Sequence, residues 1–234
     1  IFVMASFILP TSLMGLGVLL RFMEWDSTSW IDIFSFSFMG SVLLVGLPLW
    51  FIVKVCRRPL SNVGLVRKHL LRNVALGVVL IIPVFFMEYA AEETVVRASI
   101  AIAPSQAEVI RNMQKEEHLQ ALEMWPKSKD EVAKLAAVAT LLIILAPAGE
   151  EMLFRGMIYT ALRRRDKWIA LLLSSILFAI AHLQALHSFP IFLTGLILAY
   201  LFERTKSLVP AMSLHASANL LFTILWYFYP NLYT

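Results

Sequence analysis

Long apolar runs alternate with short polar segments along the chain. A helix needs about 20 apolar residues to cross the hydrocarbon core of a bilayer, with roughly 17 to 25 tolerated. Seven runs approach this length, although the third and the sixth are short: 1–20, 30–53, 74–87 with some extension, 132–162, 168–186, 188–202 and 208–229. The pattern predicts an all-α fold, a polytopic membrane helix bundle of about seven transmembrane helices.

Basic residues are concentrated in alternate connections between these runs. The connection 54–72 holds six Lys or Arg and no acid, and the connections 163–167 and 203–206 are also basic. Lys and Arg favour the cytoplasmic side of a membrane. Seven spans with a cytoplasmic N-terminus place all three basic connections on that side. We therefore expect an integral, multi-pass membrane protein with its N-terminus in the cytoplasm.

Composition agrees with a membrane location. Apolar residues make up 59% of the 234 residues, whereas an ordinary soluble domain has about half. The net charge of +4 comes from short basic clusters between apolar runs, so we expect membrane lipids around the chain and no nucleic acid as a partner. Cys56 is the only cysteine, which excludes an internal disulfide and a cysteine metal cluster.

The longest polar stretch is the segment 88–131, between the third and fourth runs. It contains nine acids and five bases, and we expect it to be partly helical and outside the membrane. Ser105 with Glu108, and Ser128 with Glu131, have the spacing of a capping box, which predicts two helix starts. The segment lies on the membrane, covers a site entrance or serves as a solvated connector. The chain as a whole, 1–234, is interpreted as a single membrane domain, with its catalytic core helices in 132–229.

Ionisable side chains inside the later apolar runs are the main functional candidates, because each costs at least a few kcal/mol at mid-membrane. Counted from the nearest basic connection, Glu150 lies 13 residues into its run, His182 lies 15 and His215 lies 9. The largest difference corresponds to roughly 9 Å along a helix, so these side chains can share one depth. Asn219 follows His215 by one helical turn and shares its face.

Three short motifs carry a resemblance to a known family. In chain order they are Glu150-Glu151-x-x-Phe154-Arg155-Gly156, Phe178-x-x-x-His182 and His215-x-x-x-Asn219. Together they resemble the motifs of the CAAX protease and bacteriocin-processing family of intramembrane endopeptidases, which includes the type II CAAX prenyl endopeptidase. The resemblance implies a helical membrane peptidase. A second Glu-Glu-x-x-x-Arg pattern at 92–97 lacks the Phe and Gly, and we interpret it as a coincidental, solvated charge cluster.

Peptide hydrolysis requires an activated water and donors for the developing oxyanion. Following the chemistry and the resemblance, we expect Glu150, assisted by His182, to activate the water. His215 and Asn219 are then expected to stabilise the oxyanion. The substrate is expected to be a peptide or protein, possibly lipidated.

The remaining motif residues are expected to support the site. Glu151 and Arg155, one turn apart, predict an ion pair that holds a fourth helix broken at 147–149. Phe178 is expected to pack in the core. His187 is interpreted as a loop residue at the outer edge.

Three alternatives stay open. Glu150, His182 and His215 have the donor types of a zinc site with an open position for water. The usual His-Glu-x-x-His pattern of zinc peptidases is absent from the sequence, so we favour catalysis without a cofactor. Membrane acids and histidines also occur in proton-coupled transporters. A non-catalytic immunity protein against a peptide toxin is the third alternative.

Overall fold

The computed structural model describes residues 30–57, 59–66, 69–120 and 132–228. Every regular element within those ranges is helical, which confirms the all-α class. The π-helices are η1, η4 and η5, and the 3₁₀-helices are η2 and η3. In chain order the elements are α3 (Trp30–Trp50), η1 (Phe51–Val55), η2 (Leu60–Val63), α4 (Leu70–Val79), α5 (Ile81–Ile102), η3 (Pro104–Gln106), α6 (Ala107–Gln120), α7 (Val132–Ala139), η4 (Thr140–Leu145), α8 (Ala146–Glu151), η5 (Met152–Tyr159), α9 (Thr160–Leu162), α10 (Lys167–Ala181), α11 (Ser188–Thr205) and α12 (Val209–Phe228).

Among the described residues, three helical stretches are long and apolar enough to cross a membrane: Phe38–Val55, Leu70–Ile102 and Leu135–Leu162. Two shorter apolar helices, Lys167–Ala181 and Val209–Leu225, accompany them. These five stretches overlap five of the apolar runs in the sequence. The run 1–20 lies outside the described residues, so the total of seven spans and the cytoplasmic N-terminus stay predictions.

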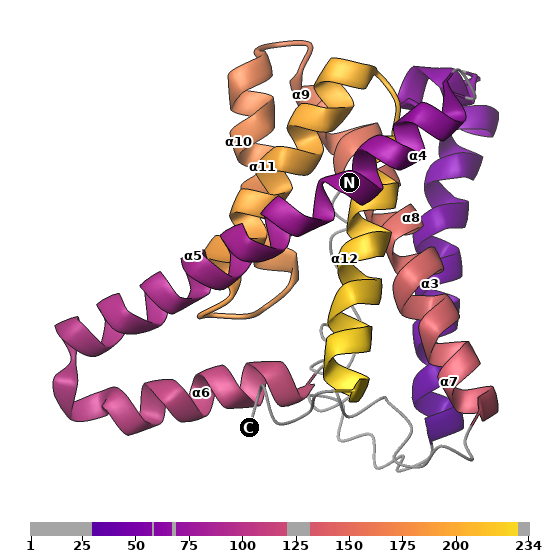
Figure 1. Cartoon of the computed structure of the whole chain (residues 1–234). Helices are drawn as coiled ribbons and strands as arrows, with labels where there is room; N and C mark the ends of the chain where they lie inside the picture. Colours follow the sequence, from indigo (N-terminus) through magenta and orange to yellow (C-terminus); the bar gives the residue numbers. More distant parts are fainter. Residues whose placement is uncertain (1–29, 58, 67–68, 121–131, 229–234) are drawn as a thin grey trace.

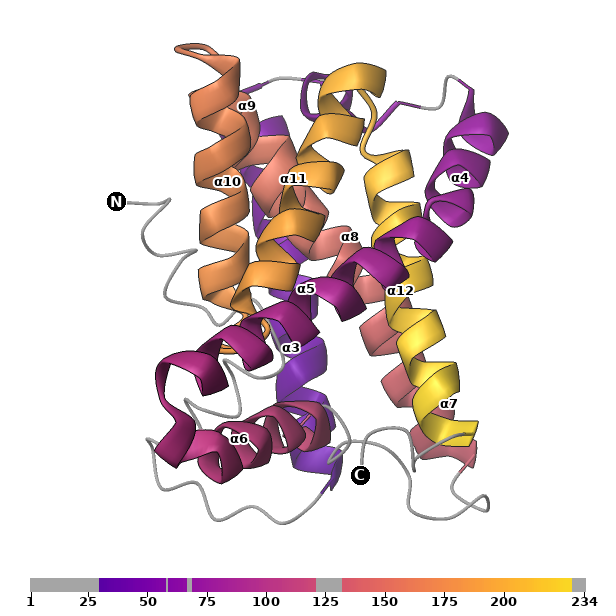
Figure 2. The ribbon, with the colours of Figure 1, turned by 60° about the vertical axis from the view of Figure 1, so that its left-hand side comes forward.

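The three basic connections lie together at one end of the bundle, the upper end in Figure 1 and in Figure 2. After α9, Arg163 contacts Glu203 of α11 through Nε and Oε2 at 2.5 Å and through Nη2 and Oε1 at 2.9 Å. The backbone N–H of Leu208 donates to the carbonyl of Gly64 at 2.8 Å, which joins the start of α12 to the connection after α3. This grouping is the one that the positive-inside rule requires of loops on the same side.

The third apolar run extends further than the sequence indicated. Helix α5 continues through Glu88 to Ile102, so the helix does not end at residue 88, and the extramembrane position of the segment 88–131 stays a prediction. Its buried positions are Val84, Glu88, Ala91, Glu92 and Val96, a stripe at helical spacing. The two acids belong to the face that packs against α11, where the Thr194 hydroxyl donates to Oε1 of Glu88. A helix start was expected at Ser105 and Glu108, and α6 begins there, at Ala107. The second expected start, at Ser128 and Glu131, lies outside the described residues.

The fourth apolar run is a continuous helix, and the expected break at 147–149 is absent. Helical backbone extends without interruption from Val132 to Leu162. Pro147 has no N–H and its ring crowds the preceding turn. The π-helix η4 comes immediately before α8, where Pro147 sits in the first turn. The altered hydrogen-bond pattern of a π-helix accommodates the proline here without ending the helix.

The core that surrounds the later motifs is formed by η5, α10, α11 and α12. Its fully buried residues include Phe154, Phe178, Leu198 and Leu214. Gly195 lets α11 approach α10 closely, because a Cβ added there would lie 3.1 Å from Cβ of Ser175 and 3.4 Å from Cδ1 of Phe178. This close approach also brings the carbonyl of Gly195 to the guanidinium of Arg155.

Candidate active site

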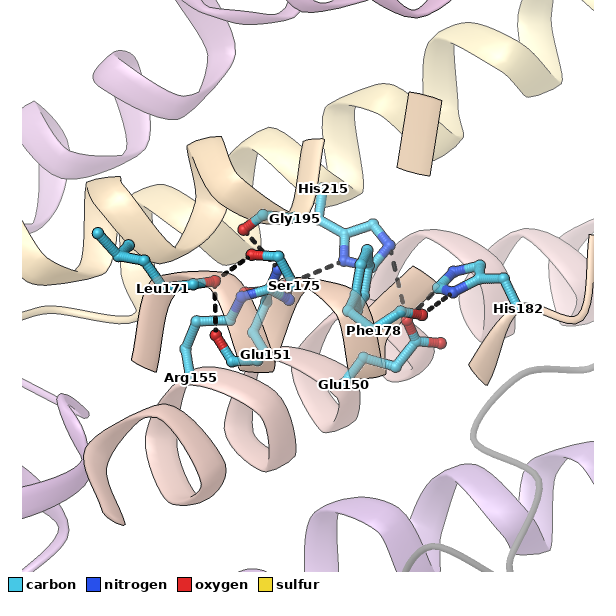
Figure 3. Close-up of polar contacts among 10 residues, drawn as sticks. Glu150, Glu151, Arg155, Leu171, Ser175, Phe178, His182, Gly195 and His215 are labelled. Carbon is cyan, nitrogen blue, oxygen red and sulfur yellow. Dashed lines mark hydrogen bonds and ion pairs between the residues drawn. The ribbon is translucent and has the colours of Figure 1, made fainter. Parts of the chain in front are cut away.

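Two adjacent acids at the end of α8 form the centre of the candidate site. Glu150 is 4% exposed and Glu151 is fully buried. Consecutive residues on a helix point about 100° apart, so the two side chains face different neighbours. Figure 3 shows Glu151 directed to Arg155 and His215, and Glu150 directed to the space between His182 and His215.

Glu151 belongs to a buried ion-pair network. Nη1 of Arg155 donates to Oε1 of Glu151 at 2.9 Å, which confirms the expected pair. Nη2 of Arg155 donates to the carbonyl of Gly195 at 3.0 Å. Nδ1 of His215 lies 3.0 Å from the same Oε1 of Glu151. A buried charge requires such compensation, and here the network links α8, η5, α11 and α12.

Glu150 faces both imidazoles. Its Oε2 atom lies 3.8 Å from Nε2 of His182 and 3.9 Å from Nε2 of His215. Oε2 is buried and has no hydrogen-bond partner among the described residues. The structure therefore brings together Glu150, His182 and His215, three of the four residues expected to carry catalysis.

The hydrogen bond at Nδ1 determines whether Nε2 of each neutral imidazole is a donor or an acceptor. Nδ1 of His182 lies 2.8 Å from the carbonyl oxygen of Phe178, which only accepts, so Nδ1 donates and the neutral ring is an acceptor at Nε2. Nδ1 of His215 likewise donates to the Glu151 carboxylate. When the His215 ring is protonated, its Nε2 is also a donor.

His182 does not lie within a span, as the sequence suggested, but at its end. Helix α10 ends at Ala181, and His182 is the C-cap residue. Phe178 holds the ring in place, because the two ring centroids are 4.6 Å apart in an edge-on contact. The Phe178 ring also contacts His215 edge-on at 5.7 Å and lies 4.3 Å from Cζ of Arg155. Phe178 is thus packed at the centre of the cluster.

Asn219 is the motif residue that the structure leaves apart. Its Nδ2 donates to the carbonyl of Leu142 in η4 at 2.7 Å. Within the described part of the chain, it makes no direct hydrogen bond to Glu150, His182 or His215. A side-chain amide has two donor hydrogens, so one remains after the bond to Leu142.

A second group of buried polar residues was missed by the sequence analysis. Glu92 was interpreted as part of a solvated cluster, but it is 7% exposed and its Oε1 accepts from Nε2 of Gln114 at 3.0 Å. His187 lies in the turn before α11, as expected of a loop residue, but its contact with an acid was not foreseen: its Nδ1 lies 3.5 Å from Oε2 of Glu92. Only the Glu93–Arg97 pair of that motif is solvated as expected.

The electrostatics of His187 follow from these neighbours. Burial alone would lower the pKa of His187, but its contact with Glu92 and the charges of Glu88 and Glu117 outweigh burial and raise the pKa. The helical stripe of α5 was the available signal, since Glu88 and Glu92 continue the spacing of Val84 and Val96.

The donor set for zinc named from the sequence was Glu150, His182 and His215. Both Nε2 atoms approach a single carboxylate oxygen of Glu150 at nearly 4 Å. Over the ranges that the structure describes, no group of three or more His, Cys, Asp or Glu side chains is arranged to hold a metal ion.

Comparison with known families bears directly on this site. Residues 132–221 match the family model described as type II CAAX prenyl endopeptidase Rce1-like. The matched segment contains all three motifs. The match links this part of the chain to a family of peptidases. No curated protein and no solved structure matches the chain significantly.

Proposed function

We propose that this protein is an intramembrane endopeptidase in which Glu150 activates a water molecule for attack on a peptide bond. The observation that carries the proposal is the convergence of two imidazole Nε2 atoms on Oε2 of Glu150, at 3.8 and 3.9 Å. These separations exceed a direct hydrogen bond. They suit groups that share a water or a reacting group between them.

In the proposed mechanism, Glu150 and His182 activate the water, and His215 stabilises the oxyanion. Glu150 accepts a proton from the water as its oxygen attacks the scissile carbonyl carbon, and neutral His182 assists by accepting at Nε2. His215, oriented by its contact with Glu151, acts in its protonated form and donates at Nε2 to the oxyanion of the tetrahedral intermediate. Glu150 then returns the proton to the leaving amine, which completes the cleavage.

Asn219 is proposed as the second oxyanion donor. It lies one turn from His215 on α12, and its bond to Leu142 leaves one N–H of the amide available. Two donors from adjacent turns of one helix resemble the paired donors of other oxyanion sites. The proposal uses no metal.

The substrate is proposed to be a peptide or protein associated with the membrane, with or without a lipid group. The apolar helices around the site favour a substrate that enters from the bilayer. The match of residues 132–221 to the type II CAAX prenyl endopeptidase model is the reason to include prenylated peptides among the candidates.

The test uses purified protein in liposomes with prenylated and unmodified membrane peptides, and mass spectrometry of the products. We expect cleavage at an internal peptide bond by the wild type and none by His215→Ala. Activity that survives metal removal is expected, whereas stoichiometric zinc whose removal abolishes cleavage would replace this mechanism. Proton-coupled uptake of the peptide without cleavage would favour a transporter.

A further inference from the structure

Helices α5 and α6 form a hairpin that places α6 below α10 and α11, where it contacts the turn that follows His182 (Figure 2). The contact is made by the carboxylate of Glu117 in α6. Its Oε1 accepts from the backbone N–H of Ala185 at 2.8 Å and of Leu186 at 3.1 Å, and its Oε2 accepts from the N–H of His187 at 3.1 Å. One carboxylate thus binds three consecutive amides that are 68 to 70 residues distant in sequence.

The turn needs such an anchor for two reasons. Helix α10 ends directly before His182, and helix ends fray unless their backbone groups are bonded. Leu183 then adopts a left-handed conformation with φ of 55°, which is unfavourable for a leucine. The chain has to hold this residue by contacts on either side.

Helix α11 itself offers no hydrogen-bond acceptor to these three amides. They precede the first turn of that helix, where N–H groups have no partner within the helix, and the first turn contains no acid. A carboxylate from α6 satisfies these donors and is favoured by the positive end of the helix dipole. Glu117 is therefore a cap that reaches α11 from another element.

A second attachment holds α6 in the same place. Gln114 lies one turn before Glu117, and its Nε2 donates to Oε1 of Glu92 at 3.0 Å. Oε2 of Glu92 in turn lies 3.5 Å from Nδ1 of His187. The turn is thus bound to α6 through its backbone and to α5 through the His187 side chain.

We propose that Glu117 is a positioning residue of the active site, whose bonds to the 185–187 amides fix the turn and so hold His182 against Glu150. The proposal rests on the proposed function, because it assigns Glu117 a role in the same reaction. The carboxylate itself touches neither the substrate nor Glu150.

The experiment compares Glu117→Ala, Glu117→Gln and the matched control Glu116→Gln, which changes an exposed neighbouring acid on α6. Two readouts are used: hydrogen exchange of the 183–188 backbone, and kcat and KM for a cleaved peptide. Glu117→Ala is expected to accelerate exchange and to lower kcat by about 10- to 100-fold with KM nearly unchanged, because a small displacement of a catalytic group affects the chemical step. Glu117→Gln keeps one acceptor oxygen and should be intermediate.

An unchanged kcat in Glu117→Ala would overturn the proposal. So would a decrease in kcat no larger than the decrease in the folded fraction of the sample, which thermal unfolding measures. Exchange equal to that of Glu116→Gln would show that the anchor does not hold the turn and would overturn it too. If the wild type cleaves no peptide, the proposed function fails by itself, and the exchange measurement still decides whether Glu117 anchors the turn.

Discussion

Nδ1 of His215 lies 3.0 Å from Oε1 of Glu151, so the second acid of the Glu-Glu pair orients this imidazole. The contact joins α8 and α12, and the two residues are 64 positions apart in sequence. Because Glu151 is already bound to His215 and Arg155, Glu150 alone has an oxygen directed between the two Nε2 atoms. The two neighbouring acids therefore have separate structural roles.

Removing the Arg155 side chain should destabilise the protein strongly. Arg155→Met leaves the buried charge of Glu151 without its partner, and breaking a buried ion pair costs about 3–5 kcal/mol of unfolding free energy. The matched control is Arg97→Met, which breaks the solvated Glu93–Arg97 pair at the same spacing. Surface pairs contribute about 1 kcal/mol or less. Denaturant unfolding in detergent measures both, and equal losses would contradict the assigned burial.

Gly77 should tolerate no side chain. A Cβ there would lie 2.5 Å from the carbonyl oxygen of Pro210 and 2.7 Å from the backbone N of Leu214, so Gly77→Ala must push α4 away from α12. Overpacking of this kind costs about 1–3 kcal/mol. In the control Gly46→Ala, on α3, the added Cβ meets nothing within 4 Å. Alanine has a higher helix propensity than glycine, which should raise the free energy of unfolding by about 1 kcal/mol. Thermal unfolding should rank Gly77→Ala lowest and Gly46→Ala at or above the wild type.

Stability should fall in acid partly through Glu203. Hydrogen bonding from Arg163, with further help from Lys206 and Tyr159, lowers the pKa of Glu203 from 4.5 to about 2. A depressed folded-state pKa stabilises the protein above pH 4.5, and this contribution is lost as the pH falls toward 2. At pH 7, Glu203→Gln should therefore have a lower free energy of unfolding than the wild type. The difference should be about 1 kcal/mol or less, because Arg163 is half exposed. The difference should shrink at pH 3; a constant difference would refute the cause given.

Asn219→Ala should lower kcat strongly while it lowers the free energy of unfolding only slightly. Loss of one oxyanion donor costs about 10²–10³ in kcat, whereas loss of the bond to Leu142 costs only about 1 kcal/mol. Peptide cleavage rates and thermal unfolding of the same samples separate the two effects. A normal kcat in a folded Asn219→Ala protein would remove this residue from the mechanism.

Local patterns in the sequence were sufficient for the helices that carry the site. The helix over 132–162 and the helices α10 and α12 follow from the apolar runs, and the spacing within each motif places its residues on one helical face. Glu150, His182 and His215 could be grouped because the basic connections indicate their depth. The family motifs supplied the assignment to a peptidase.

The parts that sequence could not provide depend on distant contacts. An acid in a polar stretch is expected to face solvent, yet Glu88 and Glu92 are buried because Thr194, Gln114 and His187 bond to or contact them. Those partners lie up to 106 residues away. Pro147 predicts a break from local geometry, but the π-helix before it absorbs the missing hydrogen bond. Neither outcome is encoded in spacing alone.

The most direct test of the central claim is kcat for Glu150→Gln compared with Glu93→Gln, which makes the same change in the other Glu-Glu-x-x-x-Arg sequence. Glutamine preserves the shape of the side chain but cannot accept the proton from water. We predict that Glu150→Gln stays folded and loses roughly 10²–10⁴-fold in kcat, while Glu93→Gln cleaves at the wild-type rate. Cleavage by Glu150→Gln at the wild-type rate would show that Glu150 is not the base.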